Sequence, residues 1–188
     1  NKAEQVTSCF VKKAGLEIVL IGDLPNELGG SYYLQTKHGL KEGVVPQVDF
    51  EAESRLQEFV LKGIEKRNIL SAHDLAEGGL LVALAEMLFT DQKIGAELNF
   101  LNVGSSNRLD AMLFGESQGR VLVAVEPSEM KAMTTLAHVI GIPIQKIGRS
   151  TENDDFVLTI DNELILHAKV SSLQKIWEDA IPSRMQLC

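Results

Sequence analysis

The sequence predicts an α+β (mixed α/β) fold in which helices cover a mixed sheet of about six strands. Two aliphatic runs, residues 16–21 and 121–125, have the composition of strands. Between Val121 and Ile147 a strand, a helix and a second strand follow one another, an order that excludes all-α and all-β folds. A chain of 188 residues is long enough to bury a full core in one domain.

The first half of the chain alternates strands or helices with turn-rich loops. The strand at 16–21 ends at Gly22, and a loop rich in turn formers leads to a short helix that opens at 32–34. After a second loop at 41–47, Asp49 is placed to cap a helix. That helix has one apolar stripe at helical period, made of Ala52, Leu56, Phe59, Val60 and Ile64.

The second half supplies most of the predicted sheet. We expect strands at 96–101, 121–125 and 144–149, and a hairpin of 156–160 with 163–167 across Asp161 and Asn162. A short helix is expected at 109–114 and a last helix at 171–180. A longer helix starts at Pro127, buries Met130 and Met133, and stops at Gly141.

Composition narrows the class of protein. The formal net charge of −8 argues against binding to the phosphate backbone of nucleic acids. No apolar run approaches the ~20 residues that span a membrane, and only two cysteines, Cys9 and Cys188, are present, so we expect a cytoplasmic protein. The chain does not begin with Met. We therefore expect residues 1–14 to lead in from an upstream domain and residues 15–188 to form a single C-terminal domain.

The stretch from Ser71 to Leu88 carries the first candidate site. A polar segment with His73 and Asp74 precedes Gly78-Gly79, and an almost entirely apolar helix follows. Backbone N–H groups at a helix start can receive a phosphate, and Asp74 would then be an oxygen ligand of Mg²⁺. The alternative is a tight turn before a buried helix, with Asp74 as its cap. His73 is expected to form structural hydrogen bonds.

The second candidate site is a polar turn between two glycines, from Gly115 to Arg120. Glu116 could hold Mg²⁺ beside a phosphate, and Ser117 and Gln118 could form hydrogen bonds to a ligand. The alternative is a solvated turn. Arg120 could pair with Glu116 or with a phosphate, and we expect a surface ion pair.

Three segments in order resemble one family: residues 28–34, residues 73–87 and residues 113–121, the last containing Gly115-Glu116-Ser117-Gln118-Gly119-Arg120. They are similar to the C-terminal part of the synthetase subunit of phosphoribosylformylglycinamidine synthase, shorter type, in the aminoimidazole ribonucleotide synthetase-like superfamily. The resemblance covers about residues 10–180. It implies the C-terminal domain fold of that superfamily.

The resemblance also implies an activity for the complete protein. That activity is the ATP- and Mg²⁺-dependent conversion of formylglycinamide ribonucleotide to its amidine with glutamine-derived ammonia, in purine biosynthesis. The implied partners are the upstream domains of the same chain, a glutaminase subunit and a small bridging subunit. The alternative is a non-catalytic nucleotide-binding or interaction domain of another superfamily member, of the selenophosphate synthetase, hydrogenase-maturation or thiamine-phosphate kinase type.

The resemblance assigns roles to residues of this chain only where they match the family's motifs. In the family's first copy of this domain, the Asp matching Asp74 binds Mg²⁺, and the residues matching Glu116, Ser117 and Gln118 bind substrate. This chain resembles the second copy, so the resemblance implies an auxiliary site for ADP at Gly78, Gly79, Glu116, Ser117 and Gln118. No catalytic residue is expected, and the fragment alone is expected to be inactive.

Overall fold

The computed structural model describes residues 6–24, 26–101 and 108–185. Cys188, residues 1–5 of the expected lead-in and Pro25 of the first loop lie outside these residues. The described part is built on a single mixed sheet with the strand order β2-β4-β1-β5-β3-β6-β7. The strands are β1 (Glu17–Ile21), β2 (Ile69–Asp74), β3 (Gly95–Phe100), β4 (Val121–Val125), β5 (Ile144–Thr151), β6 (Asp155–Ile160) and β7 (Glu163–Lys169).

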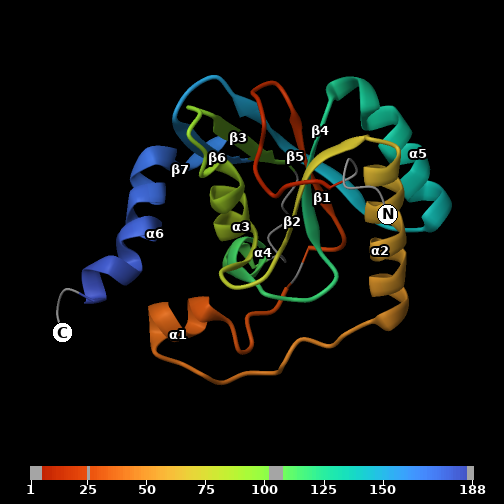
Figure 1. Cartoon of the computed structure of the whole chain (residues 1–188). Helices are drawn as coiled ribbons and strands as arrows, with labels where there is room; N and C mark the ends of the chain where they lie inside the picture. Colours follow the sequence, from red (N-terminus) through yellow and green to blue (C-terminus); the bar gives the residue numbers. More distant parts are fainter. Residues whose placement is uncertain (1–5, 25, 102–107, 186–188) are drawn as a thin grey trace.

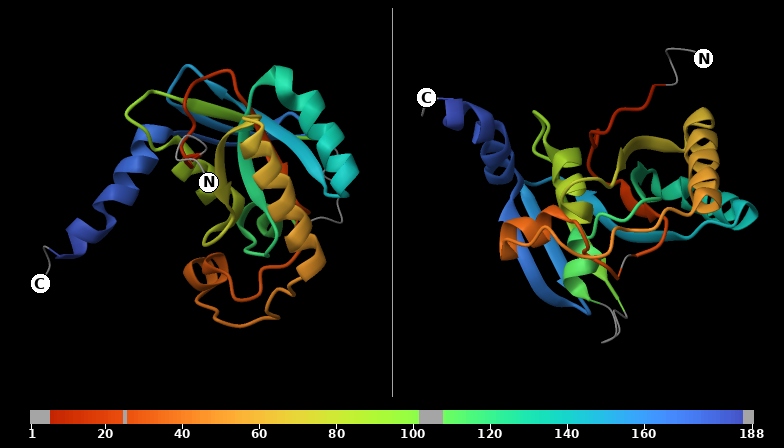
Figure 2. Two further views of the ribbon diagram at one scale, coloured as in Figure 1. Left: turned by 45° about the vertical axis from the view of Figure 1, so that its right-hand side comes forward. Right: turned by 90° about the horizontal axis from the view of Figure 1, so that it is seen from below.

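Helices cover both faces of this sheet, as Figures 1 and 2 show. On one face α2 (Phe50–Glu65) packs beside α5 (Met130–Ile140), which a 3-10 turn at Pro127–Glu129 precedes. On the other face lie α3 (Gly79–Leu88) and α4 (Leu109–Phe114), with the start of α6 (Val170–Met185). A short helix, α1 (Tyr32–His38), lies in the connection between β1 and α2. The predicted α+β class is confirmed.

Alternation along the central strands explains the aliphatic runs. In β1, Ile18 and Leu20 enter the core beneath α3, while Val19 and Ile21 enter the core beneath α2 and α5. All four side chains are fully buried. A strand that is covered on both faces needs apolar residues at every position, which is why β1 and β4 show no polar alternation.

Several local predictions are confirmed. Asp49 caps α2, since its Oδ1 accepts hydrogen bonds from the backbone N–H groups of Glu51 and Ala52 at 2.9 Å each. The β6–β7 hairpin turns at Asp161 and Asn162, whose φ angles of 48° and 67° are those of a type I′ turn. The last helix, α6, is longer than predicted, reaching Met185, and Trp177 on it is 58% exposed.

Among the described residues, the sheet has seven strands where the sequence predicted about six, because β2 was not predicted. This strand lies at the edge of the sheet, pairs with β4 alone among the named strands, and contains Ser71, His73 and Asp74. The buried Ser71 hydroxyl donates to the backbone oxygen of Phe10, and Ser8 forms a parallel bridge with Ser71. The strand is therefore stabilised by polar pairing that an apolar pattern does not report.

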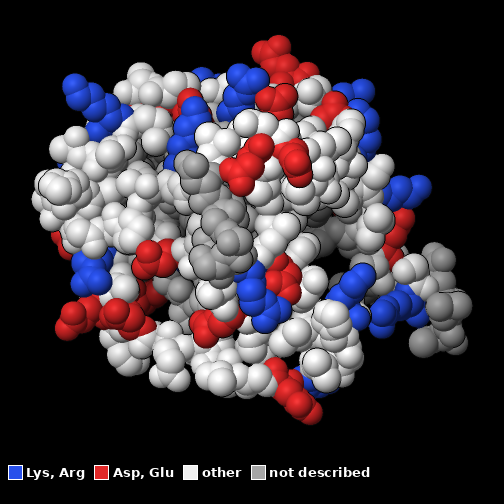
Figure 3. All heavy atoms as spheres, turned by 180° about the vertical axis from the view of Figure 1, so that it is seen from behind, with Lys and Arg blue, Asp and Glu red and all other residues white. Residues whose placement is uncertain are grey.

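No helix in the described ranges is long and apolar enough to cross a membrane. On the face shown in Figure 3, lysine and arginine side chains are interspersed with aspartate and glutamate among the described residues.

Gly79, at the start of α3, lies where a side chain does not fit. Its φ is +67°, and a Cβ atom would approach the backbone oxygen of Gly115 to 2.6 Å and the backbone of Phe114 to 2.8 Å. Two backbone segments separated by 36 positions are therefore in direct contact. Glycine is required here both for the left-handed conformation and for the close approach.

Arg120 is buried, with 3% of its surface exposed, so the expected surface ion pair was wrong. Its Nη2 donates to the backbone oxygens of Gly115 at 2.8 Å and Ser117 at 3.0 Å, and its Nε donates to Ser117 at 3.1 Å. Burial lowers the pKa of Arg120 to about 10, and attraction to Glu27 opposes part of that shift. Arg120 thus fixes the shape of the turn at residues 115–119 from its buried side.

We predict that Gly79→Ala destabilises the chain by roughly 2–5 kcal/mol, from the left-handed backbone together with the clash at Gly115. Gly141→Ala is the matched control, because φ is +75° there and no atom lies within 4 Å of the added Cβ. It should cost about 1–2 kcal/mol. Urea unfolding midpoints measure both values, and equal losses would contradict the close-packing argument.

We predict that Arg120→Lys costs about 2–4 kcal/mol in urea unfolding, because an ammonium group lacks the planar fork that reaches both carbonyls. Arg149→Lys is the control, since its side chain is 64% exposed and pairs with Glu97 on the surface. That change should stay within about 0.5 kcal/mol of the unmodified chain. Similar losses at both positions would mean that the buried hydrogen bonds of Arg120 contribute little.

Candidate functional site

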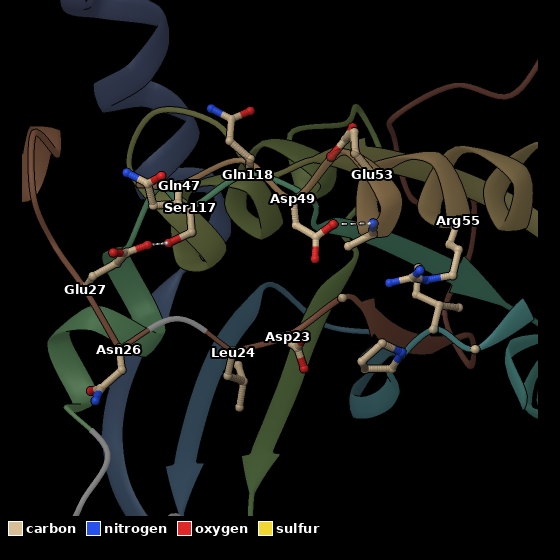
Figure 4. Close-up of a pocket in the computed structure, with 16 residues that line it drawn as sticks. Asp23, Leu24, Asn26, Glu27, Gln47, Asp49, Glu53, Arg55, Ser117 and Gln118 are labelled. Atoms are coloured by element: carbon tan, nitrogen blue, oxygen red, sulfur yellow. Dashed lines mark hydrogen bonds between the residues drawn. The ribbon is translucent and has the colours of Figure 1, made fainter. Parts of the chain in front are cut away.

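A cavity of about 390 Å³ opens at the end of β1, between the first turns of α2 and the turn at residues 115–119 (Figure 4). We call the described part of the connection between β1 and α2, residues 22–24 and 26–49, the strap. The strap forms much of the cavity wall. The polar and charged lining residues are Asp23, Asn26, Glu27, Gln47, Asp49, Glu53, Arg55, Ser117 and Gln118.

The cavity is acidic. Four carboxylates line it, those of Asp23, Glu27, Asp49 and Glu53, against the single guanidinium of Arg55. One oxygen of Asp49 is engaged in capping α2, and the backbone N–H of Ala52 is the main cause that lowers the pKa of Asp49. The Oε2 atom of Glu53 is buried without a hydrogen-bond partner in the structure. A free anion would be repelled here, whereas a cation or a cation-bearing ligand would be attracted.

Glu116 is not part of the cavity lining, and two helix starts converge on its carboxylate. Its Oε1 accepts a hydrogen bond from the backbone N–H of Gly78 at 2.8 Å and one from that of Tyr32 at 2.9 Å. Gly78 is the residue before α3, and Tyr32 is the first residue of α1. The N–H of Gly78, where the sequence predicted a phosphate, is therefore occupied by a carboxylate of the chain itself.

Ser117 and Gln118 reach the cavity directly. The Ser117 hydroxyl donates to Oε1 of Glu27 at 2.9 Å, and the two side chains point toward one another in Figure 4. The side chain of Gln118 is exposed at the cavity and is free to meet a ligand there. The residues of the predicted polar turn therefore have different roles. Glu116 accepts hydrogen bonds from backbone N–H groups, whereas Ser117 and Gln118 line the cavity.

Asp74 does not line the cavity. It ends β2 with 79% of its side chain exposed, and the residue before α3 is Gly78, without a side-chain cap. The interpretation of Asp74 as the cap of α3 was therefore wrong. Within the described ranges, no group of three or more His, Cys, Asp or Glu side chains is arranged to hold a metal ion.

His73 forms structural contacts, as expected. Its Nδ1 lies 2.7 Å from the backbone oxygen of Asp74, and its Nε2 lies 3.2 Å from Oε2 of Glu86 on α3. The ring borders a second cavity, which Cys9 and Trp177 also line and which does not include Ser117 or Gln118. His73 ties β2 to α3 and takes no part in the first cavity.

Sequence reasoning missed the contribution of the strap to the site. Apart from Asp49, the strap contributes four polar side chains to the lining, from loops that the sequence predicted only by their turn formers. They are Asp23, Asn26, Glu27 and Gln47. The one available signal was the second glycine pair, Gly29-Gly30. A Cβ on Gly29 would lie 1.9 Å from the backbone oxygen of Val44, so this glycine closes the strap on itself.

Known structures share the fold. Thermotoga maritima PurL complexed with FGAR superposes with a TM-score of 0.80 at 21% identity, covering 92% of this chain and 30% of that chain. The same protein complexed with ATP gives 0.73 at 22% identity, with 92% and 28% coverage. The Escherichia coli hydrogenase maturation protein HypE gives 0.56 at 20% identity, with 81% and 49% coverage.

Curated relatives are more similar in sequence. The phosphoribosylformylglycinamidine synthase subunit PurL of Caldanaerobacter subterraneus subsp. tengcongensis is 36% identical over 175 residues, 93% of this chain and 23% of that protein. The PurL subunit of Synechocystis sp. is 38% identical over 178 residues, again 93% of this chain and 23% of that protein. This chain therefore spans only 23% of the length of these relatives.

The family model described as AIR synthase related protein, C-terminal domain, matches residues 13–161, a range that runs from the end of the N-terminal segment through the β6–β7 turn. It contains both glycine turns, the strap and every residue that lines the first cavity. On this match, and on the fold shared with PurL, the chain belongs to the AIR synthase related protein C-terminal domain family.

Proposed function

We propose that this chain is the C-terminal part of a phosphoribosylformylglycinamidine synthase of the PurL type. The complete protein would be a ligase that uses ATP to convert formylglycinamide ribonucleotide to its amidine with glutamine-derived ammonia, in purine biosynthesis. The observation that carries the proposal is the similarity to PurL subunits, 36% identity over 93% of this chain. The chain covers 23% of those proteins, so most of the catalytic machinery would lie in the remaining sequence.

The alternative functions have weaker support. Thiamine-monophosphate kinase from Stenotrophomonas maltophilia and HypE share the fold at TM-scores of 0.53 and 0.56, below the 0.80 of Thermotoga maritima PurL. Identity to all of these structures is about the same, so the likeness speaks for the fold and not for a reaction. The curated PurL relatives favour the synthase over a kinase or a maturation protein.

Further parts of this proposal concern organisation and partners. Residues 1–14 would lead in from upstream domains of the same chain, and residues 15–188 would form one domain. A structure of PurLQS from Thermotoga maritima supports an assembly of several subunits. For the complete protein we propose a glutaminase subunit and a small bridging subunit as partners, and a cytoplasmic location.

We also propose that the cavity beside Ser117 and Gln118 is an auxiliary nucleotide site. The cavity suits a magnesium-bound nucleotide better than a free one. The carboxylates around the opening repel bare phosphate but can accept a phosphate neutralised by Mg²⁺. Mg²⁺ is commonly held by one or two carboxylates together with phosphate oxygens, so a three-residue cluster is not needed. Asp74 lies outside the lining of this cavity and is proposed as a metal ligand from the resemblance alone, as are Gly78, Gly79 and Glu116 as nucleotide contacts.

The synthase proposal predicts activity that depends on the complete protein. The full-length native protein should consume ATP only when formylglycinamide ribonucleotide and ammonia are both present, and residues 1–188 alone should show no turnover. Phosphate release and product mass measure this. Turnover with thiamine phosphate or selenide in place of the ribonucleotide would refute the proposal.

The auxiliary-site proposal predicts weak Mg–ADP binding that calorimetry can follow. Gln118→Ala should weaken binding by about three- to tenfold, the effect of one lost hydrogen bond. Gln145→Ala, an exposed glutamine on β5, should have no effect. Asp74→Ala should weaken binding only when Mg²⁺ is present, while Glu77→Ala should not. Equal binding in all four variants would refute the auxiliary-site proposal but would leave the synthase proposal intact.

A further inference from the structure

The middle of the strap lies at the surface of the domain. Residues 35–45 are exposed, including the apolar side chains of Val44 and Val45 at 74% and 72%. Their backbone closes on itself, since Gly30 N–H donates to the oxygen of Glu42 and Gly43 approaches Gly29. This closed loop carries α1 and lies below the body of the domain in Figure 1. Leu28 and Ser31 at the start of the loop are buried, whereas residues 35–45 have few contacts with the body of the domain, so the loop is docked through residues 26–33.

Among the described residues, the hydrogen bonds and ring contacts that join residues 26–33 of the strap to the body of the domain converge on the segment from Arg108 to Ser117. Tyr32 N–H donates to Glu116, and the Tyr33 ring stacks on Phe114 with centroids 4.9 Å apart and planes at 15°. The Ser117 hydroxyl donates to Glu27. At the far end of α4, Arg108 N–H donates to the side chain of Asn26 at 3.2 Å.

Glu116 differs from the other residues that contact the strap because it bonds to the strap and to the body of the domain at the same time. The same oxygen, Oε1, accepts from Tyr32 on the strap and from Gly78 on the body of the domain. Hydrogen bonds from backbone N–H groups to an ionised carboxylate are stronger than those between neutral groups. If this carboxylate is removed, a backbone donor on each side loses its partner, and the strap loses its charged contact with the body.

From this geometry we infer that Glu116 is the latch of a movable strap. The strap opens as a unit at residues 26–45 when Tyr32 leaves Glu116, and access to the cavity is controlled by that step, since Asn26 and Glu27 of the strap form part of the cavity wall. Glu116 therefore acts as a positioning residue in this chain. The inference goes beyond the proposed function and does not depend on what the cavity binds.

Limited trypsin digestion of the full chain tests the latch. Lys37 and Lys41 lie in the exposed part of the strap, while Lys62 on α2 and Arg149 on β5 lie outside it. When opening is fast compared with cleavage, the cleavage rate follows the population of the open state. Glu116→Ala should therefore raise cleavage at Lys37 and Lys41 by about tenfold or more. Glu116→Gln, which keeps a neutral acceptor, should give a smaller increase.

Glu77→Ala and Glu77→Gln are the matched controls, because Glu77 is an exposed glutamate directly beside Gly78. Both should digest like the unmodified chain. Hydrogen exchange gives a second readout: the amides of Tyr32 and Gly78 should exchange faster in Glu116→Gln and unchanged in Glu77→Gln.

Each remaining outcome counts against the latch. Cleavage that rises equally at Lys62 and Arg149 would show that Glu116 holds the whole domain together and not the strap. Digestion of both Glu116 variants at the unmodified rate would show that the stacking of Tyr33 and the Ser117 contact hold the strap without it.

Discussion

The close contact between two glycine turns is the constraint on which the site depends. The backbone of Gly79 meets that of Gly115 at a distance that no side chain permits, and Glu116 then lies where it can accept the N–H of Gly78. Arg120 holds the second turn from its buried side through the carbonyls of Gly115 and Ser117. Each contact presupposes the others, because Glu116 reaches Gly78 only if the turn keeps this shape. The shape of this turn places Ser117 and Gln118 at the cavity.

Strand pairing brings these turns together. The edge strand β2 runs antiparallel to β4, and Asp74 at the end of β2 pairs with Val121 at the start of β4. The chain after Asp74 and the chain before Val121 must therefore leave the sheet at the same place, where Leu75 N–H donates to the backbone oxygen of Arg120. Gly79 and Gly115 are 36 residues apart in sequence, yet the register of one strand pair makes the two turns neighbours.

The strap adds a third segment to this corner and gives the cavity its acidic character. Glu27 comes from the strap, Glu53 from α2 and Ser117 from the turn, and residues 141–143 complete the wall, so the lining is assembled from four parts of the chain. Its charge is the reverse of what a bare phosphate would need, which is why a magnesium-bearing ligand suits it better. One turn places Ser117 in the cavity lining and also places Glu116 where it accepts the hydrogen bond from Tyr32. Site architecture and strap docking are thus properties of one structural unit.

The sequence by itself determined the class of fold and most of its elements. Burial of a whole strand or helix face leaves a local pattern, so the strand at Val121–Val125, the helix at Leu109–Phe114 and the cap at Asp49 were predictable. Only the tertiary structure decided that Ile69–Asp74 is a strand, that Arg120 is buried and that Glu116 joins Tyr32 to Gly78. These features depend on partners distant in the chain. A polar side chain that is satisfied by a distant backbone group has the same local sequence as one that is satisfied by water.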